Sequence, residues 1–329
     1  MIRTRRARVP YRSAGRAAFP PRRQIGRPLT LIAIRPALRR TARRVLAVAA
    51  AATLLASAAV VERPAPAAAA GYTGPHPGTF TGLGFDTCAA PSNEQMNAWL
   101  QSPYRAVGIY IGGVNRGCAQ ANLTKEWVST QQAAGWRFFP LYVGLQAPCT
   151  TYLRRIDPTR AAEQGREAAD DAATNAVNLG LAPRSTLILD IEHYEGDAAC
   201  TAAVDTFASA WTTRLHERGY LSGLYTSVGS YGLRDQVAAY SRPGYARPDL
   251  LDFARWDGVQ TVSDPAIPET YWAPKRRMKQ YLGDHYETWG GVRINIDSNY
   301  LDLEQPAYTM AGTAQKRRYG TATGGTSYR

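Results

Sequence analysis

The sequence predicts a single (β/α)8 barrel of the TIM type, preceded by an N-terminal export segment. Eight short apolar runs follow one another between residues 81 and 297, and segments with helical periodicity or loops separate them. Eight such repeats in roughly 230 residues match the size of a closed parallel barrel. A doubly wound open sheet is the alternative fold, because the number of strands alone does not establish closure.

The predicted elements alternate along the chain. The strands are residues 81–86, 106–112, 137–143, 185–192, 221–226, 250–255, 278–282 and 292–297. The clearest helices are residues 92–101, with Ser92 as N-cap, and 124–134, 161–179 and 201–218, each followed by a glycine. We expect one barrel domain over 81–304, a short linker at 71–80, and a disordered tail at 305–329 that is rich in Gly, Thr and Ser.

The net charge of +13 comes from the N-terminal segment rather than from the predicted barrel. Residues 1–70 hold 15 arginines and one acid, Glu62, so the rest of the chain carries 24 basic and 25 acidic residues. A basic stripe with interleaved aromatic residues is missing from residues 71–329 of the sequence. The composition therefore argues against a nucleic-acid partner.

Residues 1–70 have the features of a secretion signal, with arginines, an apolar run from Val45 to Val61 and an Ala-x-Ala site that ends at Ala70. The pair Arg43-Arg44 permits a twin-arginine signal. An uncleaved membrane anchor is the alternative, although the apolar run is short and rich in alanine. We expect a secreted or cell-envelope protein with no stable membrane insertion after cleavage, and a monomer.

All four cysteines, Cys88, Cys118, Cys149 and Cys200, lie after this segment, which fits an oxidising compartment and two disulfides. Four cysteines allow three pairings, and the neighbouring predicted loops favour 88–118 with 149–200. Zinc is the competing interpretation, but the sequence has no CxxC pair or histidine cluster. No metal or other cofactor is predicted.

Four acidic residues, Asp86, Asp190, Glu192 and Asp297, lie at the predicted C-terminal ends of the first, fourth and eighth strands. Side chains alternate across a strand, so Asp190 and Glu192 share the inward face while Leu187, Leu189 and Ile191 face the helices. The strand ends of a barrel converge on one open face. We therefore expect these acids in one cleft, where paired carboxylates are suited to glycoside hydrolysis. Helix capping or loop anchoring is the alternative role.

Aromatic and amide side chains at other predicted strand ends could contact sugar rings and hydroxyls. The candidates are Tyr110, Tyr142, Gln146, Tyr225, Trp256 and Gln280. Other chemistries lack their motifs, since the sequence has no HExxH pair, no Gly-x-Ser-x-Gly elbow and no phosphate-binding glycine loop after a strand.

The combination of motifs closely resembles an actinobacterial secreted family of glycoside-hydrolase-like domains of unknown function. The resemblance covers about residues 80–304 and depends on the runs Gly84-Phe85-Asp86-Thr87-Cys88, Tyr110-Ile111-Gly112-Gly113, 140–146, Asp190-Ile191-Glu192 and Leu224-Tyr225-Thr226-Ser227. More distantly, the acids, Tyr225-Thr226-Ser227 and Gln280-Tyr281 are similar to Chalaropsis-type muramidases. That likeness implies a glycosidase with Glu192 as general acid and with Asp190, Asp86 and Asp297 shaping the site. Tyr142-Val143-Gly144 and Tyr110-Ile111-Gly112-Gly113 depart from the muramidase pattern.

From these residues we expect Glu192 to protonate the glycosidic oxygen and Asp190 to stay ionised. The expected partner is a polysaccharide or peptidoglycan-like glycan. Two other functions stay open: a catalytically silent glycan-binding protein of the cell envelope, and an interaction scaffold that uses the outer helices.

Overall fold

The computed structural model describes residues 79–303, and these form a closed barrel of eight strands in the order β1 to β8. The predicted closure is confirmed, and the open-sheet alternative is wrong. The predicted export segment at 1–70, nearly all of the linker at 71–80 and the tail at 305–329 lie outside the described residues. Within 79–303, no helix is long and apolar enough to cross a membrane.

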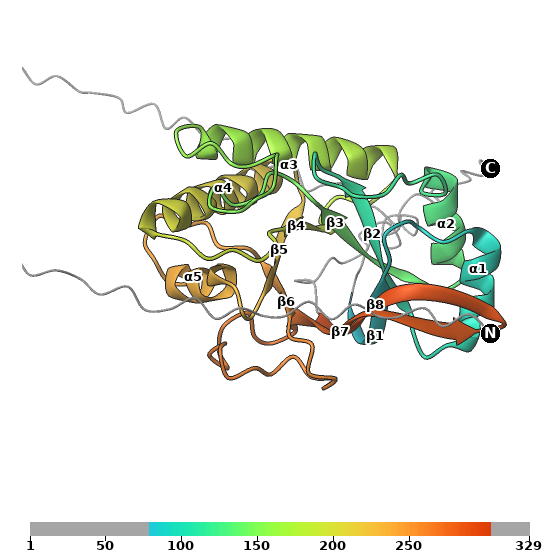
Figure 1. The fold of residues 1–329 in the computed structure, drawn as a ribbon. Helices are drawn as coiled ribbons and strands as arrows, with labels where there is room; N and C mark the ends of the chain where they lie inside the picture. The colour runs from blue at the N-terminus through green and yellow to red at the C-terminus, as the bar shows by residue number, and fades with distance from the viewer. Residues whose placement is uncertain (1–78, 304–329) are drawn as a thin grey trace, which may run out of the picture. The chain divides into compact units, whose positions relative to one another are not determined.

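Five of the strands are followed by helices that cover the outside of the barrel (Figure 1). In chain order the elements are β1 Phe80–Asp86, α1 Asn93–Ala98, the 3-10 turn η1 Trp99–Gln101, β2 Ala106–Gly112, α2 Lys125–Ala133, β3 Arg137–Tyr142, α3 Ala161–Asn178, β4 Thr186–Asp190, α4 Ala198–Glu217, β5 Leu221–Ser227, α5 Tyr231–Ala239, β6 Leu250–Ala254, β7 Arg276–Trp289 and β8 Val292–Leu303.

Local sequence signals explain the helix starts. Ser92 caps α1 in a reciprocal capping box with Gln95, Thr124 caps α2, and Asp197 caps α4 by accepting the backbone N–H of Cys200. The start of α4 therefore lies three residues before the predicted one. Helix α5, whose N-cap is Ser230, was not predicted from the sequence.

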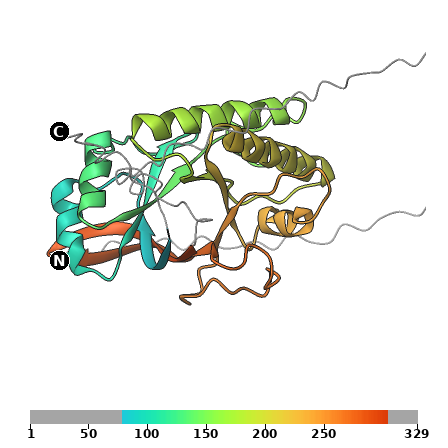
Figure 2. The ribbon, with the colours of Figure 1, turned by 180° about the vertical axis from the view of Figure 1, so that it is seen from behind.

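The last two strands correct the predicted parallel repeat. β7 and β8 form a long antiparallel hairpin, and β8 also pairs antiparallel with β1 (Figures 1 and 2). Gly290 and Gly291 connect them with φ values of 58° and 81°, the left-handed conformation that a tight two-residue hairpin turn requires. Asp297 thus lies within β8, not at its C-terminal end, but its register partner is Asp86, so it still reaches the predicted face.

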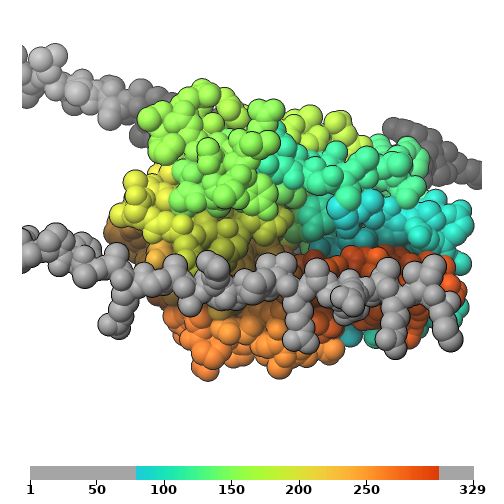
Figure 3. All heavy atoms as spheres, viewed as in Figure 1, coloured from blue at the N-terminus to red at the C-terminus, as the bar shows by residue number. Residues whose placement is uncertain are grey.

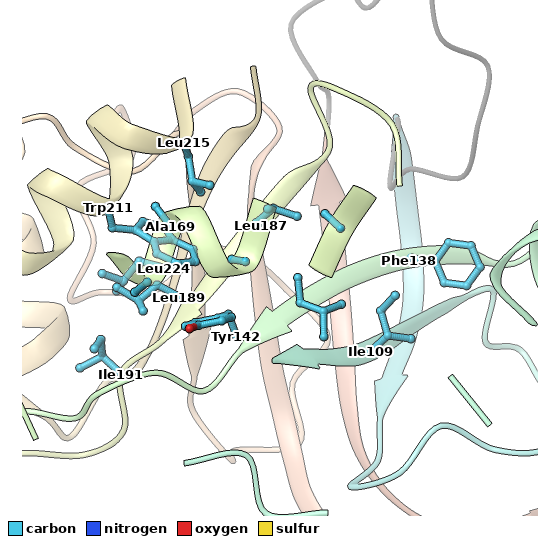
Figure 4. Packing of buried hydrophobic residues seen from close by; sticks show 14 of the residues in the cluster. Ile109, Phe138, Tyr142, Ala169, Leu187, Leu189, Ile191, Trp211, Leu215 and Leu224 are labelled. Atoms are coloured by element: carbon cyan, nitrogen blue, oxygen red, sulfur yellow. The ribbon is translucent and has the colours of Figure 1, made fainter. Parts of the chain in front are cut away.

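Two apolar layers hold the barrel. Phe139, Leu141, Ile188, Met278 and Leu301 belong to the cluster inside the barrel. Leu187, Leu189 and Ile191 instead pack with α3 and α4 residues such as Trp211 in the layer between strands and helices (Figure 4). The strand parity predicted for residues 187–191 is confirmed, since the two sets fall on opposite faces. In the space-filling view the atoms of α3 and α4 form a continuous outer surface (Figure 3).

Candidate active site

Carboxylates from separate strands meet in one cleft at the open end of the barrel. A cleft of about 290 Å³ is lined by all four predicted acids, Asp86, Asp190, Glu192 and Asp297. A deeper hollow of about 210 Å³ is lined by the same four residues together with Asp252. The closed barrel therefore brings acids that are up to 211 positions apart in sequence to a common space.

Asp86 is buried on the floor of the cleft, and three donors surround its carboxylate. Tyr110 donates to Oδ1 at 2.8 Å, and Asn299 and Gln280 donate to Oδ2 at 2.8 and 3.2 Å. Burial and the charge of Asp297 raise the pKa of Asp86 to about 6, although the three hydrogen bonds oppose that rise. Asp86 is thus a buried carboxylate that its neighbours hold in one orientation.

Asp190 and Asp252 lie in a different environment, because no donor within residues 79–303 reaches either side chain. They are 5 % and 2 % exposed, and the Oδ1 atom of each is buried without a hydrogen-bond partner among the described residues. Burial, followed by neighbouring carboxylates, raises the pKa of both groups well above the ordinary aspartate value. That direction runs against the expectation that Asp190 stays ionised.

Glu192 lies two residues beyond the end of β4 and is half-buried at the cleft wall. Burial is the main cause that raises the pKa of Glu192, and the negative charge of Asp297 adds to it, while a backbone hydrogen bond from His193 and the His193 ring oppose it. An acid that keeps its proton at higher pH, yet faces an open cleft, is suited to donate that proton.

Gln280 of β7 connects the two sides of the cleft. Its Nε2 donates to Asp86 Oδ2 at 3.2 Å and to Asp297 Oδ2 at 3.4 Å, and its Oε1 accepts from Tyr225 Oη at 3.2 Å and Trp256 Nε1 at 2.9 Å. The acceptors and donors fix the orientation of the amide. Asp297 is also held by the backbone N–H of Asp284, so both carboxylates that contact Gln280 are supported by donors.

The structure places four of the six predicted contact residues, Tyr110, Tyr225, Trp256 and Gln280, on the wall of the deep hollow. Trp256 is 61 % exposed, and its ring lies so close to Gly283 that a Cβ at that position would fall 2.2 Å from it. The indole is therefore held at its N–H by Gln280 and lies against Gly283, while most of the residue is exposed. The contact role of these residues stays a prediction.

The structure places Tyr142 and Gln146 elsewhere, which corrects their predicted position at the cleft. Tyr142 points to the helix layer, where its ring lies 5.3 Å from that of Trp211 and its hydroxyl donates to Asp171 at 2.9 Å (Figure 4). Gln146 is fully buried. Its amide donates to the Asp190 carbonyl at 2.9 Å and accepts the Glu192 N–H at 2.9 Å. Gln146 thus braces the backbone that carries both acids.

Sequence reasoning missed several residues of the cleft. Asp252 lies in the middle of a predicted strand rather than at its end, and the alternation that places Leu250 inside the barrel also places Asp252 there. Arg116 and Tyr152 come from the loops after β2 and β3 and line the outer cleft. Asp252 could have been found from strand parity, whereas the loop residues carry no comparable signal.

The predicted disulfides are both present and hold the loops around the cleft. Cys88–Cys118 connects the loops after β1 and β2, and Cys149–Cys200 connects the loop after β3 to the start of α4. Cys88 itself lines the cleft beside Asp86. The pairing of neighbouring loops is confirmed, and the alternative of a zinc site is wrong for these four cysteines.

Residues 97–301 match the model of the Rv2525c-like, glycoside hydrolase-like domain. The chain belongs to this family. The match spans β2 to β8 and includes Asp190, Glu192 and Asp297, while Asp86 lies just before it. This confirms the resemblance to glycoside-hydrolase-like domains that the sequence motifs indicate. None of the curated proteins matches the chain.

Solved structures with a similar chain path have low sequence identity to this Rv2525c-like protein. The Tat-secreted protein Rv2525c of Mycobacterium tuberculosis is 11 % identical over 68 % of this chain and 96 % of its own, with a TM-score of 0.49. The spore cortex lytic enzyme SleM of Clostridium perfringens is 19 % identical over 67 % of each chain, with a TM-score of 0.48. Neither likeness carries an inference about activity or substrate.

Proposed function

We propose that this Rv2525c-like protein hydrolyses glycosidic bonds of an extracellular or cell-envelope polysaccharide, with Glu192 as the general acid. The observation that carries the proposal is the half-buried Glu192, whose pKa is raised, at the wall of an open cleft with Asp297 and Asp86 beside it. Membership of a glycoside-hydrolase-like family supports the same reaction class.

The proposed roles of the four acids follow from the burial and hydrogen bonds of each side chain. Glu192 donates its proton to the glycosidic oxygen as the bond to the sugar carbon breaks, and water then supplies the new oxygen on that carbon and gives up a proton to a carboxylate of the cleft. The positive charge that develops on the sugar ring needs a nearby carboxylate. Asp86 and Asp297 accept hydrogen bonds that favour the charged form, and these bonds oppose the rise in pKa that burial causes at both residues. Asp190 lacks such donors, and because burial raises its pKa, we assign it no charged role. Its expected role as the ionised partner therefore passes to Asp86 and Asp297.

Export fits this function. Two disulfides that hold the cleft loops are stable in an oxidising compartment, and the arginine-rich segment with its Ala-x-Ala site supplies a route out of the cell. A polysaccharide outside the cytoplasm is the substrate that such a protein would meet.

The test is the release of reducing ends from purified peptidoglycan and from soluble α- and β-glucans. Wild-type protein should release them, and Glu192→Gln should reduce the rate by about 100-fold or more while its circular dichroism spectrum is unchanged. Glu167→Gln, an exposed change on α3 with the same loss of charge, serves as the control and should keep full activity.

The rival function predicts a different result in the same assay. A catalytically silent glycan-binding protein would show saturable retention on one of these polysaccharides without any new reducing ends. Equal turnover by wild type and Glu192→Gln would instead remove Glu192 from the acid role.

A further inference from the structure

The deep hollow beneath the cleft contains hydrogen-bond acceptors without donors. Within residues 79–303, Asp86 receives three hydrogen bonds, whereas the carboxyl groups of Asp190 and Asp252 receive none, although both side chains are at least nine-tenths buried. A buried carboxyl group without a partner is costly. Two of them lining one hollow indicate a ligand that supplies the missing donors.

The walls of the hollow cannot supply these donors. The lining includes neither lysine, arginine nor histidine. Each side-chain N–H or O–H group of the lining already donates to another residue. Tyr110 donates to Asp86, and Tyr225 and Trp256 donate to Gln280 Oε1. Gln280 Nε2 donates to Asp86 and Asp297. The hollow therefore presents five carboxyl groups. Among the described residues that line it, the only side-chain donor left free is the O–H of a carboxyl group that is itself protonated.

The size of the hollow restricts the ligand to a small group. Its volume of about 210 Å³ is below the range of typical ligand clefts, about 300–1,000 Å³. It opens into the larger cleft that carries Glu192, because both spaces share Asp86, Tyr110, Asp190, Glu192 and Asp297. One sugar unit of a longer glycan could thus enter the hollow while its neighbours stay in the cleft.

We propose that the deep hollow binds the protonated amino group of a hexosamine, so that the glycan recognised here carries de-N-acetylated amino sugars. An ammonium group offers three donors and a positive charge. An acetamido group offers one N–H and a carbonyl oxygen that the carboxylates repel. A divalent metal ion fits less well, because residues 79–303 hold no group of three or more acidic, His or Cys side chains arranged for metal binding.

This inference names the substrate class of the proposed function and takes from it only that the cleft is a glycan site. Burial raises the pKa of Asp190 and Asp252, and a bound cation would lower both again, so binding should release protons. The loss of one unfavourable buried carboxyl group should also make Asp252→Asn at least as stable as wild type at neutral pH, so this variant should fold.

Calorimetric titration of the full chain with glucosamine and galactosamine oligosaccharides, and with their N-acetylated counterparts of equal length, tests the proposal. Wild type should bind the amine form of at least one pair about tenfold tighter than its N-acetylated form, because charge-assisted hydrogen bonds are involved. Asp252→Asn should abolish this preference, and the control Glu167→Gln should keep it. Titrations in two buffers of different ionisation enthalpy should show proton release.

The inference is overturned if the amine forms bind no tighter than the N-acetylated forms, if no oligosaccharide binds, or if the preference survives in Asp252→Asn. Saturable binding of Mg²⁺ or Ca²⁺ alone that Asp252→Asn removes would replace the amine by a metal ion. Cleavage of N-acetylated glycans without any amine preference would leave the proposed function intact and end this inference. Amine-selective binding without cleavage would support this inference and contradict the proposed hydrolysis.

Discussion

At the scale of single residues, the acids of the cleft differ in the hydrogen bonds that they accept. Asp86 is surrounded by Tyr110, Asn299 and Gln280, while Asp190 and Asp252 have no donor in the part of the chain that the structure describes. Residues of one chemical type thus have separate roles, because hydrogen bonds favour the charged form and burial without them favours the neutral form.

Asp86 should make stability depend on pH. Its pKa is raised from 3.8 to about 6 in the folded protein, so the folded state holds the proton more tightly than the unfolded state. The stabilisation is complete below pH 3.8 and is lost as the pH rises through about 6, an effect of about 3 kcal/mol for this change in pKa.

Urea unfolding of wild type and Asp86→Asn from about pH 4 to about pH 7 measures this effect. The difference in the free energy of unfolding should shift in favour of the variant as the pH rises. A difference that does not change with pH would contradict the account.

Tyr142 should matter for packing and not for the reaction. Tyr142→Phe removes its hydrogen bond to Asp171 and should lower the free energy of unfolding by about 1 kcal/mol. Reducing-end release should be unchanged. A large loss of activity with normal stability would mean that the hydroxyl does reach the cleft.

At the scale of elements, Trp256 and the β7 strand position one wall of the cleft. Trp256 leads the connection from β6 to β7, and three buried or half-buried cations hold that connection: Arg255 pairs with Asp264, Lys279 with Asp257, and Arg277 donates to the carbonyls of Pro268, Glu269 and Tyr271. The side chain proposed to contact a sugar ring is thus part of a connection held by ion pairs and hydrogen bonds.

Gly283→Ala should disturb this side chain, because the new Cβ would lie 2.2 Å from the Trp256 ring. We expect weaker glycan binding, by about tenfold, since a stacking contact contributes about 1 kcal/mol or more, and a change in tryptophan fluorescence. Gly229→Ala, where the new Cβ would meet no atom within 4 Å, is the matched control. Equal affinities for the two variants would exclude Trp256 from binding.

Strand pattern and helix caps were sufficient to predict β1 to β6 and the faces of Asp86, Asp190 and Glu192. They failed where both faces of a strand are apolar, as in β3, because Phe138 and Phe139 lie on opposite sides and give no alternation to orient Tyr142. The predicted parallel direction of β8 is wrong because Gly290-Gly291 forms a two-residue hairpin turn, which joins antiparallel strands.

At the scale of the whole molecule, the proposed function depends on the closure of the barrel and on the two disulfides that connect its loops. Asp86 and Asp297 are neighbours only because β8 closes on β1. The Cys149–Cys200 disulfide joins residues with a sequence separation of 51 and connects the segment after β3 to α4. Asp190 and Glu192 lie between these two cysteines in the sequence.

Replacing both Cys149 and Cys200 by alanine should lower the free energy of unfolding by about 2–4 kcal/mol. Because the backbone near Glu192 is also braced by Gln146, the folded variant should keep part of its activity. Thermal unfolding with and without reductant checks this expectation, and an unchanged midpoint would show that the link contributes nothing to stability.

The most direct test of the account is the pH dependence of kcat/KM for glycan cleavage by wild type and Asp297→Asn. Burial and the charge of Asp297 raise the pKa of Glu192, so activity should fall at high pH as Glu192 loses its proton. Removal of the Asp297 charge should move this alkaline limb to lower pH. An alkaline limb at the same pH in both proteins, or no cleavage of any glycan, would contradict the claim that Glu192 is the acid of this cleft.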